Sequence, residues 1–194
     1  MKNTKTFQNL MNSFAGESQA RNRYRMFASI AKNEGWHNIA SIFEETAENE
    51  YYHAKEFYSL LVEMVGEENL PEMMEVNGSY PIARKSTYDN LTYAADGENE
   101  EVTVYAEFAQ VAKEEGFSKV ASKFKLIAAV EAHHANRYEK VAQLLKAEEL
   151  LNKEESTSWK CMKCGHIHSG KKAPGVCPIC SYEAGYFEKF ELNV

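Results

Sequence analysis

The sequence predicts a mainly α-helical protein, in which a four-helix bundle with a long crossover connection is followed by a small C-terminal domain built on metal-binding knuckles. Three observations predict this fold class. The N-terminal part contains two copies of one helical pattern, each copy carries the motif Glu-x-x-His, and all four cysteines lie within twenty residues near the C-terminus. We place the bundle at residues 1–152 and a linker plus the cysteine domain at 153–194.

The helical part is an internal repeat with an offset of 81 residues. Identical residues recur at this offset without a gap: Glu17/Glu98, Tyr24/Tyr105, Phe27/Phe108, Ala31/Ala112, Glu34/Glu115, Gly35/Gly116, Phe43/Phe124, Glu50/Glu131 and His53/His134. These matches predict two copies of one helical hairpin. Each hairpin supplies one Glu from its first helix and a Glu-x-x-His motif from its second.

The spacing of apolar residues predicts helices over about 6–34, 37–65, 92–116 and 118–151. Gly35 ends the first of them. The connection over 66–92 contains glycines and prolines, and it is long enough for the second hairpin to start from the opposite end of the bundle. Residues 153–158 are predicted to be a polar linker.

A Glu and a His three residues apart lie on one face of a helix, so both can reach the same metal ion. Taken alone, such a pair is more often a solvated helix face, and Glu17 could instead pair with Arg21. The repeat favours the ligand interpretation, because an isolated buried charge is very costly without a cation. Two Glu-x-x-His motifs with one further Glu from each remaining helix form the di-iron or di-manganese site of ferritin-like bundles.

Two other histidines are not expected in this site. His37 also follows a Glu by three residues, but the repeat has Ser118 at the equivalent position. His133 is adjacent to His134 and points about 100° away around the helix, so we expect it on the outside.

Composition excludes several classes of function. The net charge is −7 and the pI about 5.5, which argues against binding nucleic acid through its phosphates. No apolar run approaches the length of a membrane span, and no signal-peptide pattern follows Met1. We therefore expect a soluble, cytoplasmic protein that binds neither nucleic acid nor membrane.

The four cysteines form two Cys-x-x-Cys knuckles, Cys161/Cys164 and Cys177/Cys180. Two knuckles complete a tetrahedral site of four thiolates, which suits Zn²⁺ or a single iron. A domain of this size is too small for a self-sufficient core, so the metal must supply much of its folding free energy. A zinc ribbon without redox activity remains an alternative at this point.

The chain resembles the rubrerythrin family along nearly its whole length. The resemblance rests on Phe14–Arg21, both Glu-x-x-His motifs, Gly97–Glu101 and the four-cysteine module, whose Gly165, Pro178 and aromatic residues are similar to rubredoxin. It implies an oxo- or carboxylate-bridged pair of non-haem irons in a ferritin-like bundle and one Fe(Cys)4 centre. The implied ligands are Glu17, Glu50, His53, Glu98, Glu101, Glu131 and His134 for the di-iron site, and Cys161, Cys164, Cys177 and Cys180 for the other.

The implied activity is a peroxidase that protects against oxidative stress. Hydrogen peroxide is reduced to water, and electrons pass through the Fe(Cys)4 centre from an upstream donor, a rubredoxin or an NAD(P)H-dependent reductase. The alternatives are a ferroxidase or oxidase that uses O2, and a zinc-ribbon binding protein. Because the fourth helix carries the cysteine module far from its own di-iron site, we expect a head-to-tail homodimer or a larger homo-oligomer.

Two details go beyond the resemblance. Glu101 corresponds to Ala20 in the repeat, so the seventh ligand breaks the symmetry, and we hypothesise that one iron alternates between His53 and Glu101. Tyr24 and Tyr105 occupy equivalent positions two turns beyond Glu17 and Glu98. They either support ligand carboxylates through hydrogen bonds or are ordinary core tyrosines.

Overall fold

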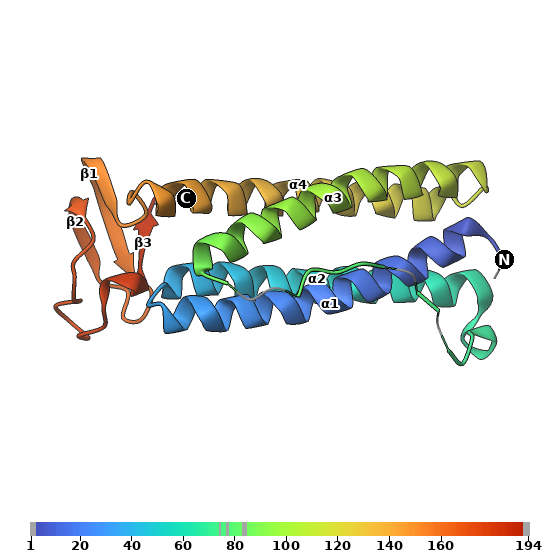
Figure 1. Cartoon of the computed structure of the whole chain (residues 1–194), viewed down its shortest axis with the longest axis horizontal. Coiled ribbons are helices and arrows are strands. Elements are labelled where there is room, and N and C mark those ends of the chain that lie inside the picture. The colour runs from blue at the N-terminus through green and yellow to red at the C-terminus, as the bar shows by residue number, and fades with distance from the viewer. Residues whose placement is uncertain (1–2, 74, 77, 83–84, 192–194) are drawn as a thin grey trace.

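The computed structural model describes residues 3–73, 75–76, 78–82 and 85–191. Four long helices form a bundle, and a small sheet lies at one of its ends (Figure 1). The helices are α1 (Lys5–Asn33), α2 (His37–Val65), α3 (Thr87–Glu114) and α4 (Ser118–Lys146). The contacts of α1 with α2 and of α3 with α4 make two hairpins, as the repeat predicts. The mainly α-helical fold class is confirmed.

The two hairpins turn in the same way. Gly35 and Gly116 have φ angles of 83° and 87°, a left-handed conformation that favours glycine. Each turn closes with a backbone hydrogen bond, from Trp36 N to Ala31 O (2.8 Å) and from Phe117 N to Ala112 O (2.7 Å). The sequence repeat is therefore also a structural repeat.

The connection after α2 starts with the short helix η1 (Glu67–Asn69) and runs back along the bundle to the end where α3 begins (Figure 1). The predicted start of the third helix near Thr92 was wrong, because α3 begins at Thr87. The Ser86 hydroxyl accepts a hydrogen bond from Asp89 N (3.2 Å), which caps this helix. The connection is correspondingly shorter than the predicted 66–92.

The sheet has the order β2-β1-β3 and is antiparallel, with β1 at Asn152–Cys161, β2 at Ile167–Lys172 and β3 at Phe187–Phe190. The predicted linker over 153–158 was wrong, because these residues belong to β1. The fourth helix also ends earlier than predicted, at Lys146 rather than Leu151. The core of this domain is small: Trp159, Cys161, Cys177 and Phe187.

The cysteine domain contacts the α1–α2 turn of its own chain through its short helix η2 (Ala184–Tyr186). The His37 ring stacks on the Tyr186 ring at a centroid distance of 3.7 Å, and its Nε2 lies 3.0 Å from Glu183 Oε1. Asn38 Nδ2 donates to Phe187 O at 3.0 Å. His37, which the sequence excludes from the metal site, thus holds the two domains together.

We expect Gly185→Ala to loosen this docking. An added Cβ would lie 1.7 Å from the Gly35 carbonyl oxygen, so backbone must move apart. Trypsin should then cleave faster at Lys146 and Lys153, which border the interdomain segment. Gly175→Ala is the matched control, since nothing lies within 4 Å of an added Cβ there. Equal cleavage rates in both variants would contradict the docking described here.

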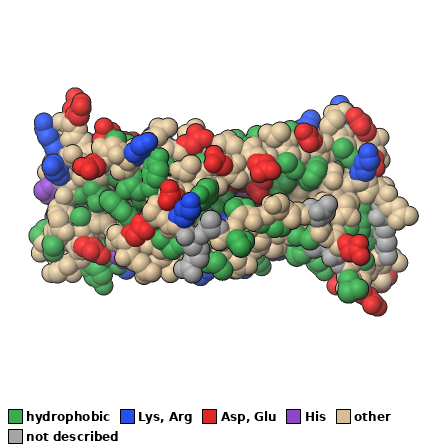
Figure 2. All heavy atoms as spheres, viewed as in Figure 1, with side chains coloured by type: hydrophobic (Ala, Val, Ile, Leu, Met, Phe, Trp, Pro, Cys, Tyr) green, Lys and Arg blue, Asp and Glu red, His purple; other side chains and the backbone are tan. Residues whose placement is uncertain are grey.

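None of the helices in the described part of the chain combines the length and apolar character that a bilayer crossing requires. On the face shown in Figure 2, Lys and Arg are interspersed with Asp and Glu rather than gathered into a basic patch.

Candidate metal centres

Six side chains from all four helices meet inside the bundle. They form two groups, and within each group the ligand atoms lie within 4.8 Å of one another. One group contains Glu17, Glu50, His53 and Glu131, and the other contains Glu50, Glu98, Glu131 and His134. The four carboxylates are almost completely buried. Because Glu50 and Glu131 belong to both groups, they are placed to bridge two metal ions.

Both imidazoles turn Nδ1 toward the carboxylates. His53 Nδ1 lies 2.9 Å from Glu50 Oε2 and 2.9 Å from Glu131 Oε1, and His134 Nδ1 lies 2.8 Å from Glu131 Oε2. On its other side, His134 Nε2 lies 3.2 Å from Asn49 Oδ1. An Nε2–H that donates to this amide oxygen leaves Nδ1 free to bind a metal.

The two tyrosines connect the hairpins at this centre. Tyr24 of the first hairpin donates to Glu98 Oε1 of the second at 2.5 Å, and Tyr105 of the second donates to Glu17 Oε1 of the first at 2.5 Å. The sequence leaves open whether these tyrosines support ligand carboxylates or are ordinary core residues. The structure shows that both donate hydrogen bonds to carboxylates of the centre. Each tyrosine fixes the orientation of one terminal carboxylate.

The donor set fits two cations. Glu17 Oε2 and Glu98 Oε2 are buried and have no hydrogen-bond partner among the described residues. Buried carboxylates this close repel one another and need positive charge to be stable. Carboxylate oxygens with one imidazole per group suit iron or manganese.

The pKa values of the carboxylates and of His134 also indicate that the centre needs positive charge. Burial, followed by the charges of neighbouring carboxylates, raises the pKa of Glu17 and Glu50 well above its usual range. Burial would also raise the pKa of Glu131, but hydrogen bonds from His134 and His53 lower it. Burial alone would lower the pKa of His134, yet its hydrogen bond to Glu131 and the nearby carboxylate of Glu98 raise it to about 9.

We therefore predict that the metal-free protein loses stability as the pH rises from 5 to 9. Below about pH 4.3 Glu17 and Glu50 are protonated in both states, and above it these two groups ionise first in the unfolded chain, which favours unfolding. Protonated His134 stabilises the fold fully below about pH 6.5, and this contribution is lost as the pH rises through about 9. Thermal unfolding at several pH values checks this. A melting temperature that rises over this range in the metal-free protein would contradict it.

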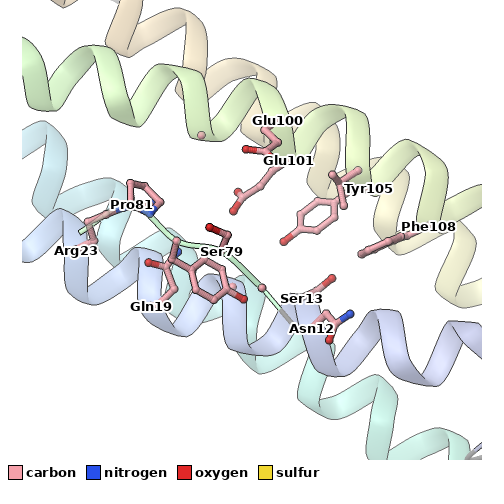
Figure 3. Close-up of a pocket in the computed structure, with 15 residues that line it drawn as sticks. Asn12, Ser13, Gln19, Arg23, Ser79, Pro81, Glu100, Glu101, Tyr105 and Phe108 are labelled. Carbon is pink, nitrogen blue, oxygen red and sulfur yellow. The ribbon is translucent and has the colours of Figure 1, made fainter. Parts of the chain in front are cut away.

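Glu101 lies beside the centre but in neither group. Its carboxylate points from α3 into the space between α3 and α1 (Figure 3). Burial, and then the charge of Glu17, raises the pKa of Glu101 well above its usual range, so the two carboxylates interact strongly. The charge of Glu98 acts on Glu101 next, so Glu101 is near both groups and interacts most strongly with the one that contains Glu17 and His53.

The four cysteines form a second centre. Their Sγ atoms lie within 4.8 Å of one another, with 3.7 Å between Cys161 and Cys180 and between Cys164 and Cys177. The two knuckles are closed alike, by hydrogen bonds from Gly165 N to Cys161 O and from Ser181 N to Cys177 O (both 2.9 Å). His133 is exposed, outside both centres.

A four-helix bundle that surrounds one buried centre with two Glu-x-x-His motifs and two further glutamates defines the class of ferritin-like di-metal carboxylate proteins. Comparison with known proteins then gives the family. The family model "Rubrerythrin" matches residues 8–88 and 89–162, and the model "Rubrerythrin, rubredoxin-like domain" matches 159–188. The chain belongs to the rubrerythrin family.

Curated relatives extend over the whole chain. Rubrerythrin-1 of Clostridium acetobutylicum is 50% identical, with 100% of this chain and 98% of the relative covered. Rubrerythrin of Clostridium perfringens is 46% identical, with 98% and 97% covered. Among solved structures, nigerythrin in a mixed-valence state gives a TM-score of 0.64 at 31% identity, with 98% of this chain and 91% of that chain covered.

The family fixes the cofactors and the broad class of activity. The chain carries the di-iron site of the rubrerythrins and their rubredoxin-like four-cysteine iron site. It is an oxidoreductase of a family of di-iron, peroxidase-like proteins associated with oxidative stress. A bacterioferritin of Desulfovibrio desulfuricans, with a TM-score of 0.64 at 23% identity over 75% of this chain and 82% of that chain, shares the fold of the bundle.

Proposed function

We propose that this protein is a peroxidase that reduces hydrogen peroxide to water with electrons delivered through its four-cysteine centre. The observation that carries the proposal is the buried pair of groups that share Glu50 and Glu131. When bound, two ferrous ions supply one electron each. Reductive cleavage of one O–O bond requires these two electrons. The residues Glu17, Glu50, His53, Glu98, Glu101, Glu131 and His134 would hold these ions, and the four cysteines the third.

The protein's own residues hold the ligands of this centre in place and exclude water from its two sides along the bundle. Apolar clusters lie on both sides of it along the bundle, one around Phe57 and Phe124 and one around Phe27 and Phe43. They exclude water along the bundle axis, so the carboxylates act in a medium of low dielectric constant. Tyr24 and Tyr105 limit the movement of Glu98 and Glu17.

The two halves of the centre differ at two repeat positions. Glu101 corresponds to Ala20, and Asn49, which holds His134, corresponds to Val130. His53 therefore lacks the amide that restrains His134, and it lies in the group with which Glu101 interacts most strongly. Both differences support the proposal that His53 would hold one iron in the reduced state and that Glu101 would hold it in the oxidised state, because a harder ferric ion favours a carboxylate.

Glu101→Ala is expected to lower the rate of peroxide reduction by about 10- to 100-fold, the usual range for a residue that tunes a metal site. Glu107→Ala, an exposed glutamate on the same helix, is the control. Crystals of the oxidised and reduced unmodified protein should show one iron at two positions. An iron that stays in one position in both states would refute the alternation.

Electron delivery favours an oligomer. Lys146 ends α4 twelve residues beyond His134, about 18 Å along the helix. The cysteine module of the same chain lies beyond that end (Figure 1). We therefore propose a head-to-tail homodimer in which the partner's module supplies the electrons, with a rubredoxin or an NAD(P)H-dependent reductase as the upstream donor. A species that sediments as a monomer during turnover would refute the dimer.

Stopped-flow mixing of the anaerobically reduced protein with H2O2 or O2 tests the activity. We expect oxidation by peroxide to be at least tenfold faster than oxidation by O2 at equal concentration. A faster reaction with O2 would favour the oxidase alternative. A colourless protein with zinc in the cysteine site after expression in iron-rich medium would favour the zinc-ribbon alternative.

A further inference from the structure

A cavity of about 250 Å³ lies between α1 and α3, and residues 78–81 of the connection form part of its wall (Figure 3). Glu101 and Tyr105 line it, and the Tyr105 hydroxyl donates to Glu17 of the metal centre. A molecule in this cavity thus contacts Glu101 directly and is separated from Glu17 by the single side chain of Tyr105.

The cavity is much larger than hydrogen peroxide, which has only two non-hydrogen atoms. A protein cavity of about 150 Å³ is enough to bind benzene. Along α1 the cavity extends from Asn12 to Arg23, eleven residues or about 16 Å. It can therefore hold a peroxide that carries an organic group.

The wall combines polar groups that have no partner with an apolar surface. Ser13 is only 3% exposed, and its Oγ has no hydrogen-bond partner among the described residues; the same holds for the buried Nη1 of Arg23. Val104 and Phe108 form an apolar part of the wall. Unpartnered buried polar groups are costly, so these two indicate a polar ligand.

Two glycines widen the cavity without being required by packing. Gly16 and Gly97 occupy equivalent repeat positions inside helices, where glycine is less favourable than alanine. An added Cβ would meet only Tyr80 Oη at 3.9 Å and Arg23 Nη2 at 3.7 Å, which are ordinary contacts. Their absent side chains leave space next to the centre.

We infer that this cavity binds small, neutral alkyl hydroperoxides and that the protein reduces them at the same centre; this rests on the proposed peroxidase function. The hydroperoxide group would lie at Glu101 and the alkyl group against Val104 and Phe108. The O–O bond breaks, and ROOH takes up two electrons from the reduced iron centre and two protons from solvent to give ROH and water. The wall carries Glu100 and Glu101 as well as Arg23, so it has no excess of positive charge that would favour a substrate with a carboxylate.

The test compares tert-butyl hydroperoxide, which has as many non-hydrogen atoms as benzene, with hydrogen peroxide. We expect the unmodified protein to reduce both, and Val104→Phe to lower the ratio of kcat/KM for tert-butyl hydroperoxide over that for H2O2 at least tenfold. Val111→Phe, a half-buried valine on the same helix outside the cavity, should leave this ratio within twofold. Iron content and melting temperature show whether the variants are folded.

A second measurement does not depend on turnover. In zinc-loaded protein, the Val104 methyl resonances should shift and saturate with added tert-butyl alcohol, the product alcohol, and the binding should be lost in Gly97→Leu. Reduction of H2O2 without reduction of tert-butyl hydroperoxide, or alcohol shifts that do not saturate, would overturn this inference and leave the peroxidase function standing. Failure to reduce H2O2 itself would overturn the peroxidase function.

Discussion

Replacing Glu50 with alanine is expected to remove iron from both positions in the bundle and to lower the rate of peroxide reduction more than 100-fold. Glu50 belongs to both ligand groups, so its loss removes a donor from each ion. Even residues that only support metal ligands typically change affinity or activity by about 10- to 100-fold, and a shared ligand should exceed this. Iron content and stopped-flow oxidation by H2O2 measure the effect.

Glu48→Ala provides the matched control, because Glu48 lies on the same helix two residues away and is exposed. Glu50→Ala should change the stability of the metal-free protein and that of the iron-loaded protein in opposite directions. In the metal-free protein Glu50→Ala should raise the melting temperature, since it removes one of several buried, mutually repelling carboxyl groups. In iron-loaded protein it should lower the melting temperature. A Glu50→Ala variant that keeps two irons per bundle would contradict the bridging role.

Replacing Cys177 with serine is expected to have the second large effect, a loss of more than about 100-fold in turnover with an external electron donor. Among its described residues the module has a core of only four buried side chains, so its metal supplies much of the folding free energy. The absorbance of the Fe(Cys)4 centre should disappear together with the sheet. A single oxidation of chemically reduced protein by H2O2 should persist, because the bundle centre lies elsewhere.

Ile179→Ser is the control for this variant, since Ile179 lies in the same knuckle and is 69% exposed. Turnover in Cys177→Ser close to that of the control would show that electrons reach the bundle without the module. The proposed route of electrons would then be wrong.

The repeat made most of the bundle predictable. Gly35 and Gly116 mark both turns, and the 81-residue offset separates the two Glu-x-x-His motifs from the similar but unrelated Glu34–His37 pair. The start of α3 was missed although Ser86 and Asp89 form a recognisable cap. The spacing of apolar residues, which predicts a start near Thr92, does not include this cap.

The region after α4 could not be predicted from local pattern. Residues 147–151 continue a helical composition, but Glu148 adopts a φ of 58° and Leu151 O accepts a hydrogen bond from Ala173 N at 3.0 Å. Strand β1 is polar, and its pairing with β2 and β3 rather than an apolar alternation holds it in place. These are tertiary effects that no short window of sequence contains.

Two functional features also needed the structure. The residue that corresponds to Asn49 in the repeat is Val130. The matches between the two copies, which indicate the other site residues, therefore do not indicate Asn49. The cavity beside Glu101 combines α1, α3 and a connection without helical pattern, and only their arrangement in space shows it. The pair Gly16 and Gly97, at equivalent positions inside two helices, is the one sequence feature that could have pointed to it.

X-ray diffraction with anomalous scattering at the iron edge, on protein isolated from iron-rich cells, tests the central claim most directly. We expect two irons inside the bundle, both in contact with Glu50 and Glu131, and a third among the four cysteines. A single iron in the bundle, or irons bound only at surface carboxylates, would contradict the account.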